Sequence, residues 1–370
     1  MKLSKILISG VRNISSAELA PSPALNLIIG ENGSGKTSLL ESIYILSTAR
    51  SFRTVKIRNI VSSVEATVDK ALIYGEITSG SSGVMEAQQG VEVSNKGKVR
   101  ARRNGASVTN ASILAHALPV QLINSDTFQL LEGSPKIRRQ YMDWGLFHVE
   151  HDYVESWSRF NRALKQRNRL LRYGKLTGLE AQLKPWNEEL AACAEQIHSL
   201  RMDHMSELAP KIESKFSQMC LVAGLDVSYR SGWDNEVTYG DYLANNFERD
   251  RVLGYTRDGP HRADLSIKLE GLQASERLSR GQSKMLVCAL KLVQGDIVSD
   301  IRGYKTIYLV DDLPSELDAE NRDVFLKQLK ETKGQVFITA VDESFMIVDK
   351  DSSLTNAVFH VKQGVFSKVK

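Results

Sequence analysis

The sequence predicts an α/β protein in which a phosphate-loop domain with an antiparallel β-subdomain carries an α-helical hairpin arm. Three observations predict it: the stretch "GENGSGKTS" at residues 30–38, alternating short apolar pieces from about 70 to 125, and helical apolar stripes from about 147 to 217. We expect residues 1–148 to form the N-terminal part of the domain with its β-subdomain. Residues 149–240 should form the arm, and 241–370 the C-terminal part of the domain.

The phosphate loop lies between an expected strand and an expected helix. "ALNLIIG" leads into it, and "KTSLLESIYILSTA" follows with apolar residues at helical spacing. Backbone N–H groups and the helix N-terminus together hold phosphates in such loops. We expect Lys36 to reach the β- and γ-phosphates of ATP, and the Thr37 hydroxyl to bind Mg²⁺. The expected nucleotide-binding residues of the loop are Gly30, Glu31, Asn32, Gly33, Ser34, Gly35, Lys36, Thr37 and Ser38.

The β-subdomain is expected from pieces such as "ALIYGEI", "GVEVS" and "VQLI", separated by Gly and Ser. They predict a small antiparallel sheet beside the nucleotide site. Separately, "KLSKILISG" at the start of the chain is expected to form a strand before "ALNLIIG". The stretch "KGKVRARRNG" carries five basic residues between 96 and 103 and no acid. It is either a solvated hairpin tip or a contact to a phosphate backbone.

Two apolar stripes predict the arm. Tyr153, Trp157, Phe160 and Leu164 step by four, three and four residues, and a second stripe contains Leu190, Cys193, Ile197, Leu200 and His204. We expect two antiparallel helices joined around "RYGKLTG", with Pro185 in the first turn of the second. Between 159 and 175 the chain has seven Lys or Arg and no acid, which indicates a solvated face or a nucleic-acid contact.

Composition sets broad limits. The formal net charge of +4 permits an acidic partner without requiring one, and the apolar runs are shorter than a membrane span needs. Cys193, Cys220 and Cys288 lack the spacing of zinc ligands, so we expect reduced thiols. Together with the absence of a secretory signal pattern, these features predict a cytoplasmic location without membrane contact.

The stretch "TIYLVDD", residues 306–312, reads as a buried strand that ends in two carboxylates. In ATPases with a phosphate loop, carboxylates at the end of such a strand bind Mg²⁺ and the attacking water. We expect Asp311 to hold Mg²⁺ together with Thr37, and Asp312 to polarise the attacking water.

"LSRGQSK", residues 278–284, precedes another helical apolar pattern. Ser279, Gly281 and Gln282 would lie at a helix N-terminus, where an anion is favoured. Because Ser279 is far downstream of Lys36, it need not serve the phosphate loop of its own chain. The expected catalytic set is Lys36, Asp311, Asp312 and Ser279.

The order of phosphate loop, "LSRGQ", "YLVDD", "SELD" and a final strand resembles the ABC-type ATPase heads, including the SMC proteins. Within that group the chain is similar over most of its length to the RecF family of bacterial recombination mediators. The supporting stretches are "LNLIIGENGSGKTSLLESIYIL", "RSFRT" at 50–54, "GSPKIRRQYMDWGLFH" at 133–148, "ALKQRNRLLR" at 163–172 and "TRDGPHRADL" at 256–265.

This resemblance implies an ABC-type head that dimerises on ATP, with each nucleotide between Lys36 of one subunit and Ser279 of the other. It implies DNA binding at junctions of single strand and duplex, slow hydrolysis, and RecO and RecR as partners. We call "LSRGQSK" the signature. Its Arg280, where transporter-type proteins have Gly, is a feature shared with the RecF family. Asp312 stands where Glu is usual, and Thr339 where many ABC proteins have His. Phe52 replaces an expected His, and the glutamine-loop equivalent lies between Gln121 and Asp126.

Two weaker groups stay open. His261, Arg262 and Asp264 in "GPHRADL" have the composition of a catalytic set, but without a nucleophile a hydrogen-bonded structural turn is the better interpretation. Lys136, Arg138 and Arg139 either face DNA phosphates or lie on a solvated helix start.

Three other functions compete. A transporter ATPase subunit has the same motifs but a shorter interval between loop and signature, and no basic arm. An SMC-like structural protein needs a far longer coiled coil. A small-molecule kinase has no use for "LSRGQSK" and "SELD".

Overall fold

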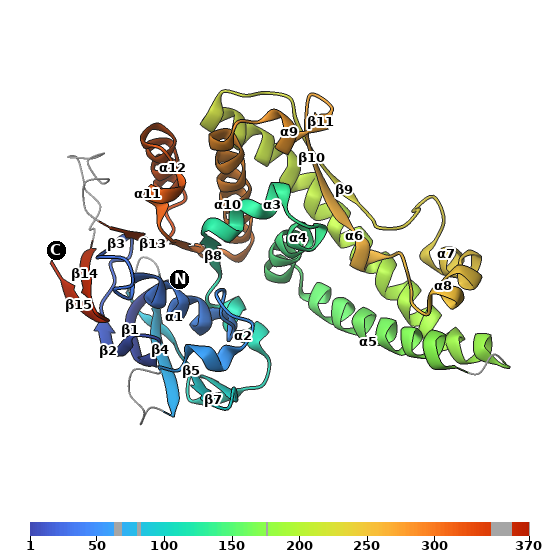
Figure 1. The fold of residues 1–370 in the computed structure, drawn as a ribbon, viewed down its shortest axis with the longest axis horizontal. Coiled ribbons are helices and arrows are strands. Elements are labelled where there is room, and N and C mark those ends of the chain that lie inside the picture. Colours follow the sequence, from blue (N-terminus) through green and yellow to red (C-terminus); the bar gives the residue numbers. More distant parts are fainter. Residues whose placement is uncertain (63–68, 80–82, 175–176, 342–356, 370) are drawn as a thin grey trace. The chain divides into compact units, whose positions relative to one another are not determined.

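The computed structural model describes residues 1–62, 69–79, 83–174, 177–341 and 357–369. These residues form two compact units (Figure 1). The first contains 1–128 and 280–370, and the second contains 129–279. The boundaries expected from the sequence remain a prediction. By contacts, residues 129–148 and 241–279 group with the helical arm.

One sheet of the first unit is antiparallel. In the described residues its strand order is β2-β1-β4-β5-β6-β7. The bounds are β1 (Lys2–Val11), β2 (Ile14–Leu19), β4 (Lys70–Thr78), β5 (Met85–Ser94), β6 (Val99–Arg103) and β7 (Ala106–Val108). Alternate residues of β4 and β5 are buried, as expected for a sheet with one solvated face.

The other sheet of this unit has the order β15-β14-β3-β13-β12-β8. Its strands from β14 to β8 run parallel, and β15 pairs antiparallel with β14. Every residue of the central strands β3, β12 and β13 is buried, as in parallel strands covered on both sides. The bounds are β3 (Leu25–Ile29), β8 (Val120–Ile123), β12 (Ile307–Val310), β13 (Val336–Ala340), β14 (Ala357–Lys362) and β15 (Val365–Lys368).

The stretch "VQLI" corrects one sequence expectation. It forms β8, which pairs in parallel with β12, and so it is not part of the antiparallel sheet. A four-residue apolar run has no period that distinguishes the two sheets, so only the pairing decides. β2 is a further strand that the sequence reading did not predict.

Helix α1 (Lys36–Thr48) contacts strands of both sheets. Leu39, Leu40, Ile43 and Leu46 are completely buried in the main core, because the helix is covered on more than one side. The other helical elements of this unit are η1 (Ile57–Ile60), α2 (Ala111–Ala117), η2 (Ser125–Phe128), α10 (Arg280–Arg302), α11 (Leu313–Glu316) and α12 (Ala319–Glu331).

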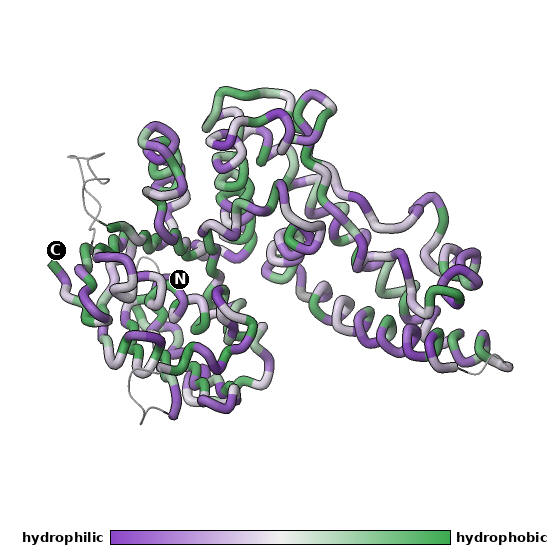
Figure 2. The backbone as a smooth tube through the Cα atoms, viewed as in Figure 1, coloured by the Kyte–Doolittle hydropathy of each residue, from purple (hydrophilic) through white to green (hydrophobic). Residues whose placement is uncertain are grey.

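The second unit is built on a helical hairpin. α5 (His151–Tyr173) packs against α6 (Leu179–Cys220), and both alternate hydrophobic and hydrophilic residues along their length (Figure 2). The two predicted stripes meet in one core cluster with Trp233 and Tyr239. The remaining elements are α3 (Gln129–Glu132), α4 (Pro135–Val149), β9 (Leu225–Arg230), α7 (Tyr239–Asn245), α8 (Phe247–Leu253), η3 (Pro260–Arg262), β10 (Asp264–Leu269), β11 (Leu272–Gln273) and α9 (Ala274–Arg277).

The placement of Pro185 in the first helical turn is wrong. α6 begins at Leu179, so Pro185 and Pro210 lie inside the helix. The turns before Pro185 are retained because Leu179 and Leu183 are buried against Leu171 of α5. Tertiary packing therefore outweighs the hydrogen bond that proline cannot donate.

The chain lacks a helix, among those described, that is both long and apolar enough to span a membrane. The three cysteines are free thiols, and Cys193 and Cys288 are buried.

Arg167 of α5 is the centre of a buried polar network. Its Nη1 lies 2.8 Å from Asp250 Oδ2, and the two side chains are 0% and 1% exposed. Nε donates to Asn187 Oδ1 at 2.8 Å, and Nη1 also donates to Thr256 Oγ1. One of the seven predicted surface cations is therefore a structural link between α5, α6 and α8.

Replacement Asp250→Ala is expected to reduce the free energy of unfolding by about 3–5 kcal/mol, because it leaves the Arg167 guanidinium buried without its anion. Urea denaturation of the full chain measures this. The matched control is Glu189→Ala, which removes the partner of the exposed Arg159, and it should cost at most about 1 kcal/mol. Equal losses in the two variants would contradict a special role for the buried pair.

Candidate nucleotide site

The phosphate loop joins β3 to α1, as predicted. Gly33 and Gly35 have φ of +79° and +121°, a region that residues with a Cβ rarely adopt. A Cβ on Gly30 would lie 2.3 Å from the carbonyl oxygen of Val361, so this position is also restricted to glycine. The loop is held by two backbone bonds, from Gly30 N to Ala340 O and from Gly364 N to Ser34 O.

The start of α1 offers N–H donors to a ligand. Gly35 is the N-cap residue and supplies no side-chain bond, so the first-turn N–H groups keep their capacity for an anion. Ser34 Oγ is buried and has no hydrogen-bond partner among the described residues. These features fit phosphate oxygens.

The Lys36 side chain contacts the backbone of the phosphate loop. Its Nζ donates to the carbonyl oxygens of Gly30 at 2.5 Å and Glu31 at 2.9 Å. Burial lowers the pKa of this ammonium, whereas the charges of Asp312 and Asp311 raise it. The side chain is thus held within the phosphate-binding region.

Asp311 and Asp312 directly follow β12. Asp311 Oδ1 accepts hydrogen bonds from Thr37 Oγ1 at 3.0 Å and from Thr339 Oγ1 at 2.8 Å. Burial raises the pKa of Asp311, and the two hydroxyl donors oppose that rise. The structure therefore brings the predicted carboxylate and the predicted loop hydroxyl into direct contact.

Asp312 has a left-handed backbone, with φ of 52°. Its Oδ2 accepts from Ser315 Oγ at 2.6 Å, and its N–H donates to Thr339 Oγ1 at 2.8 Å. Its Oδ1 is buried and has no hydrogen-bond partner among the described residues. This oxygen has spare accepting capacity, which suits a water molecule at a reacting phosphate.

A cavity of about 340 Å³ joins these groups. It is lined by Arg12, Asn13, Asn32, Gly33, Gly35, Lys36, Thr37, Ser38, Arg53, Asp311, Asp312 and Thr339. The side-chain oxygens of Thr37 and Asp311 are hard ligand atoms, which suit Mg²⁺. This ion commonly takes one or two carboxylates and completes its coordination shell with phosphates and water. A cluster of three His, Cys, Asp or Glu is not found in the described ranges, and such a magnesium site does not need one.

Arg12, Asn13 and Arg53 line the cavity but were not predicted as site residues. Asn13 Nδ2 donates to the Gly33 carbonyl at 3.0 Å, and its Oδ1 accepts from Ser38 Oγ at 3.1 Å. Asn13 therefore connects the turn after β1 to both the loop and α1. A signal was present in "GVRN", where polar residues directly follow a buried strand.

Glu41 is a fully buried carboxylate on α1 that holds both arginines. Arg12 donates to it through Nε at 3.0 Å and Nη2 at 2.9 Å, a bidentate pair. Arg53 Nη1 lies 3.5 Å away from Oε2. Glu41, the one acid of α1, thus orients two cations that line the cavity.

The signature residues are not part of the described lining of the nucleotide cavity. Ser279 is exposed and is the last residue of the second unit, directly before α10. Gly281 lies near α12, where a Cβ on it would be 3.1 Å from Asn321 Nδ2. The described residues that line the cavity do not include Ser279, Gly281 or Gln282. Gln121 belongs to the core, with its Nε2 donating to Gln294 Oε1 at 2.9 Å.

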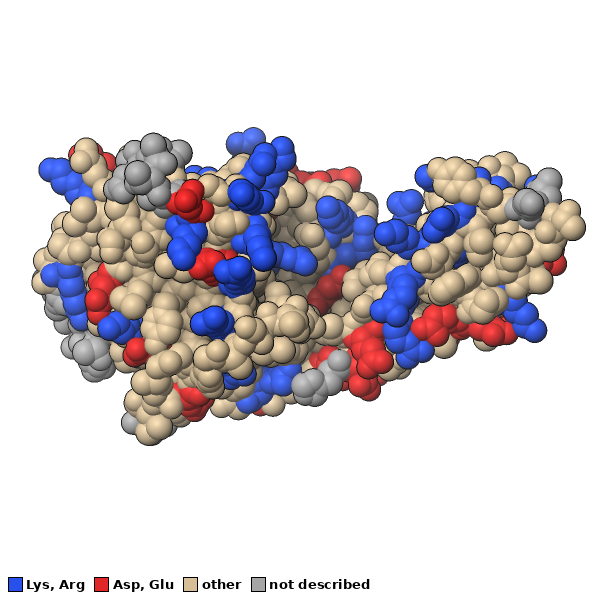
Figure 3. Space-filling view, turned by 90° about the horizontal axis from the view of Figure 1, so that it is seen from below, with Lys and Arg blue, Asp and Glu red and all other residues tan. Residues whose placement is uncertain are grey.

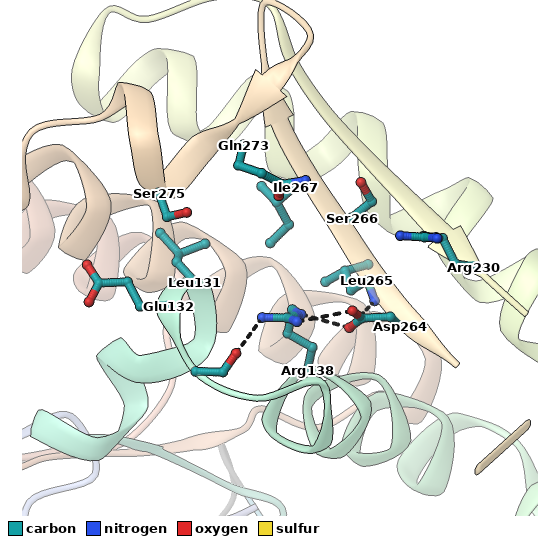
Figure 4. A pocket seen from close by; sticks show the side chains of 11 residues that line it. Leu131, Glu132, Arg138, Arg230, Asp264, Leu265, Ser266, Ile267, Gln273 and Ser275 are labelled. Atoms are coloured by element: carbon teal, nitrogen blue, oxygen red, sulfur yellow. Dashed lines mark hydrogen bonds and ion pairs between the residues drawn. The ribbon is translucent and has the colours of Figure 1, made fainter. Parts of the chain in front are cut away.

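A second, polar pocket of about 490 Å³ lies within residues 129–279 (Figure 4). Arg138 donates through Nε and Nη2 to both carboxylate oxygens of Asp264, and Arg139 donates to the Ala263 carbonyl. A freely solvated helix start is therefore wrong for these two arginines, which are half-buried and form structural bonds, whereas Lys136 is exposed. A contact of these residues to DNA phosphates stays a prediction. His261 donates through Nε2 to the Thr256 carbonyl, so "GPHRADL" is a hydrogen-bonded turn.

Three comparisons with known proteins agree. The family model described as RecF/RecN/SMC N terminal domain matches residues 2–367. A protein of Stutzerimonas stutzeri named DNA replication and repair protein RecF is 42% identical over 369 residues, covering 100% of this chain and 98% of its own. A protein of the same name from Cellvibrio japonicus is 43% identical, covering 98% of both chains.

Solved structures agree as well. The recombination mediator protein RecF with ATP has a TM-score of 0.86 at 25% identity, covering 100% of this chain and 98% of that one. An Smc head bound to a domain of ScpA has a TM-score of 0.59 at 14% identity, covering 100% and 98%, and shows the same ABC-type fold. Because the family model and the relatives cover nearly every residue, this chain belongs to the RecF family.

Proposed function

We propose that the protein is an ATP-dependent DNA-binding mediator of recombinational repair and replication restart, acting at junctions of single-stranded and duplex DNA to help load a recombinase. The observation that carries the proposal is the cavity in which the phosphate loop, Thr37 and the two carboxylates after β12 meet. Membership of the RecF family supports the DNA-repair role, since the relatives are named DNA replication and repair proteins.

Each residue of the cavity has a proposed role in ATP hydrolysis. Backbone N–H groups of the loop bind the phosphates, and Lys36 moves from its own carbonyls to the β- and γ-phosphates. Thr37 and Asp311 would hold Mg²⁺, which would supply positive charge beside the phosphate oxygens. Asp312 accepts a proton or hydrogen bond from the attacking water through its unpaired Oδ1.

Dimerisation on ATP completes the site. Ser279, Gly281 and Gln282 are proposed to contact the nucleotide of a second copy, so that ATP joins two heads and exposes a DNA-binding surface. Ser279 is accessible for this, and the signature residues are absent from the described lining of their own cavity. RecO and RecR are the expected protein partners by family resemblance. Because the chain belongs to the RecF family, the transporter and kinase alternatives lose their support.

The proposal predicts that the protein becomes a DNA-bound dimer only with ATP and Mg²⁺. Sedimentation with a short gapped duplex measures this directly. Lys36→Ala removes the phosphate contact and Ser279→Arg blocks the second copy, so each variant should remain monomeric. Dimers or DNA binding that do not change in these variants would contradict the mechanism.

Hydrolysis is expected to be slow and to depend on DNA. Asp312 is one methylene shorter than the usual glutamate, so it positions the attacking water less closely. Steady-state phosphate release, with and without the gapped duplex, measures the rate. A turnover as fast as that of a motor ATPase would contradict this expectation.

Thr339 is proposed to align the two carboxylates rather than to contact the γ-phosphate. Its hydroxyl is already committed, donating to Asp311 Oδ1 and accepting from the Asp312 N–H, and the residue is completely buried. A histidine at this position in other ABC proteins reaches the phosphate instead. In this chain the hydroxyl fixes the carboxylate that faces Thr37.

Thr339→Val should therefore reduce ATP hydrolysis about tenfold to a hundredfold, the range expected for loss of hydrogen bonds to a charged group. ATP binding without Mg²⁺ should stay unchanged, while the Mg²⁺ concentration for half-maximal ATP binding should rise. Thr339→Ser keeps the hydroxyl and is the matched control, with activity close to that of the parent protein. A valine variant with the parent's Mg²⁺ dependence would show that Thr339 only fills space.

A further inference from the structure

Four exposed cations form one stripe along α5. They are Arg162, Lys165, Arg169 and Arg172, which we call the α5 stripe. Their spacing is three, four and three residues. At about 100° per residue they lie within an arc of about 80° around the helix axis. The stripe is therefore one continuous surface and not a scatter of charges.

The stripe lies on the side of α5 opposite its buried face. That face contains Phe160, Ala163, Arg167 and Leu171, all less than a tenth exposed. At the same angle per residue, the centres of the two sets differ by about 170°. The stripe points to solvent because the opposite face packs in the hairpin core.

The other described cations of the basic run have internal partners. Arg159 forms an ion pair with Glu189, and Arg167 is buried against Asp250. Lys175 lies outside the described residues. Within the part of the chain that the structure covers, the four stripe residues make neither an ion pair nor a hydrogen bond. The pKa of Glu189 is lowered mainly by its bond from Arg159, and Arg162 adds to this without a bond of its own.

Repulsion between the like charges of the stripe destabilises α5, whereas the charges on the exposed side of α6 alternate in sign. Arg162, Lys165, Arg169 and Arg172 are like charges at i,i+3 or i,i+4, and each such pair destabilises a helix by about 0.2–0.5 kcal/mol. The exposed side of α6 alternates sign at the same spacing, with Glu180, Lys184 and Glu188. A surface selected only for solubility resembles α6, so the α5 stripe indicates a polyanionic partner.

We propose that the α5 stripe binds the sugar-phosphate backbone of DNA, an inference that rests on the proposed function and names the surface for it. Its length of about 15 Å, from the rise of 1.5 Å per residue, matches about four steps of one strand at 3.4 Å each. Three of the four cations are arginines, whose planar donors suit phosphate oxygens.

The residues around the stripe favour DNA over a membrane surface as its partner. A helix that lies on a lipid surface exposes a whole apolar face beside its cations, whereas the apolar stripe of α5 packs in the hairpin core and Tyr173, its last residue, is exposed. The flanks of the stripe carry exposed or half-exposed polar residues, Ser158, Asn161 and Asn168. Figure 3, which views the molecule from the side of α5, shows Lys and Arg gathered over the arm with Asp and Glu along one edge.

The test replaces Arg162, Lys165, Arg169 and Arg172 together by Gln in the full chain. Binding of a gapped duplex is measured by fluorescence anisotropy with ATP and Mg²⁺ over a range of salt concentrations. Loss of four phosphate contacts should reduce the slope of log K against log salt by about 3, at about 0.7–0.9 per contact. Affinity at about 0.1 M salt should fall more than tenfold, and single substitutions should each reduce the slope by about 0.7–0.9.

The matched control replaces Lys96, Lys98, Arg100 and Arg102 on and before β6 by Gln, an equal change in charge on another exposed surface. Its slope should equal that of the parent protein. ATP affinity should be the same in all three proteins. The urea midpoint should rise slightly in the α5 variant, because the like-charge pairs are removed, and stay close to that of the parent protein in the control, which excludes misfolding as the cause.

Four results would overturn the inference. They are an unchanged slope in the α5 variant, equal losses in both variants, a loss in the control alone, and polyglutamate competing better than DNA of equal charge. The last result would indicate an acidic protein partner. A parent protein that binds no DNA with ATP would overturn both this inference and the proposed function. An α5 variant with the parent's DNA binding would overturn this inference alone.

Discussion

The parallel strand order β3-β13-β12 is the constraint on which the nucleotide site depends. Parallel neighbours end at the same edge of a sheet, so the loop after β3 and the carboxylates after β12 meet across the end of β13. Thr339 occupies that intermediate strand and bonds to both Asp311 and the backbone of Asp312. The cavity is thus assembled from segments about 270 to 300 residues apart in the chain.

Charge in the protein is organised by burial. Glu41 and Asp250 are buried carboxylates, and each holds arginines whose positions matter, Arg12 and Arg53 beside the cavity and Arg167 in the arm. Arg201 is the reverse case, a fully buried arginine whose Nη2 lies 2.8 Å from Oδ1 of the half-buried Asp143 and whose guanidinium is over the Trp157 ring. The cations of the α5 stripe have no such partner among the described residues and lie at the surface, where solvent or a mobile polyanion can neutralise them.

Local patterns predicted the parts of the molecule that follow from local physics. The helical period identified α1, α5, α6 and α10, and the glycine pattern identified the phosphate loop, because both depend on neighbours in the chain. Pairing partners were not predictable: "VQLI" could belong to either sheet, and Pro185 was placed by local rules that burial of Leu179 and Leu183 overrides. Arg12, Arg53 and Arg167 look alike in the sequence, and only long-range carboxylates decide which of them line a cavity and which hold a core together.

The central strand β3 pairs with β13 and β14, both more than 300 residues further along the chain. During synthesis, the phosphate loop therefore emerges long before the strands that complete its sheet. Until then β3 has no partner strand on either side, whereas residues 129–279 form a compact unit of their own. We expect the arm to form first and the nucleotide site last, so that a chain truncated before β13 contains the complete loop sequence yet binds no ATP. Because a long insertion separates the two halves of the head, we expect nucleotide binding to begin only after the C-terminal strands have been synthesised.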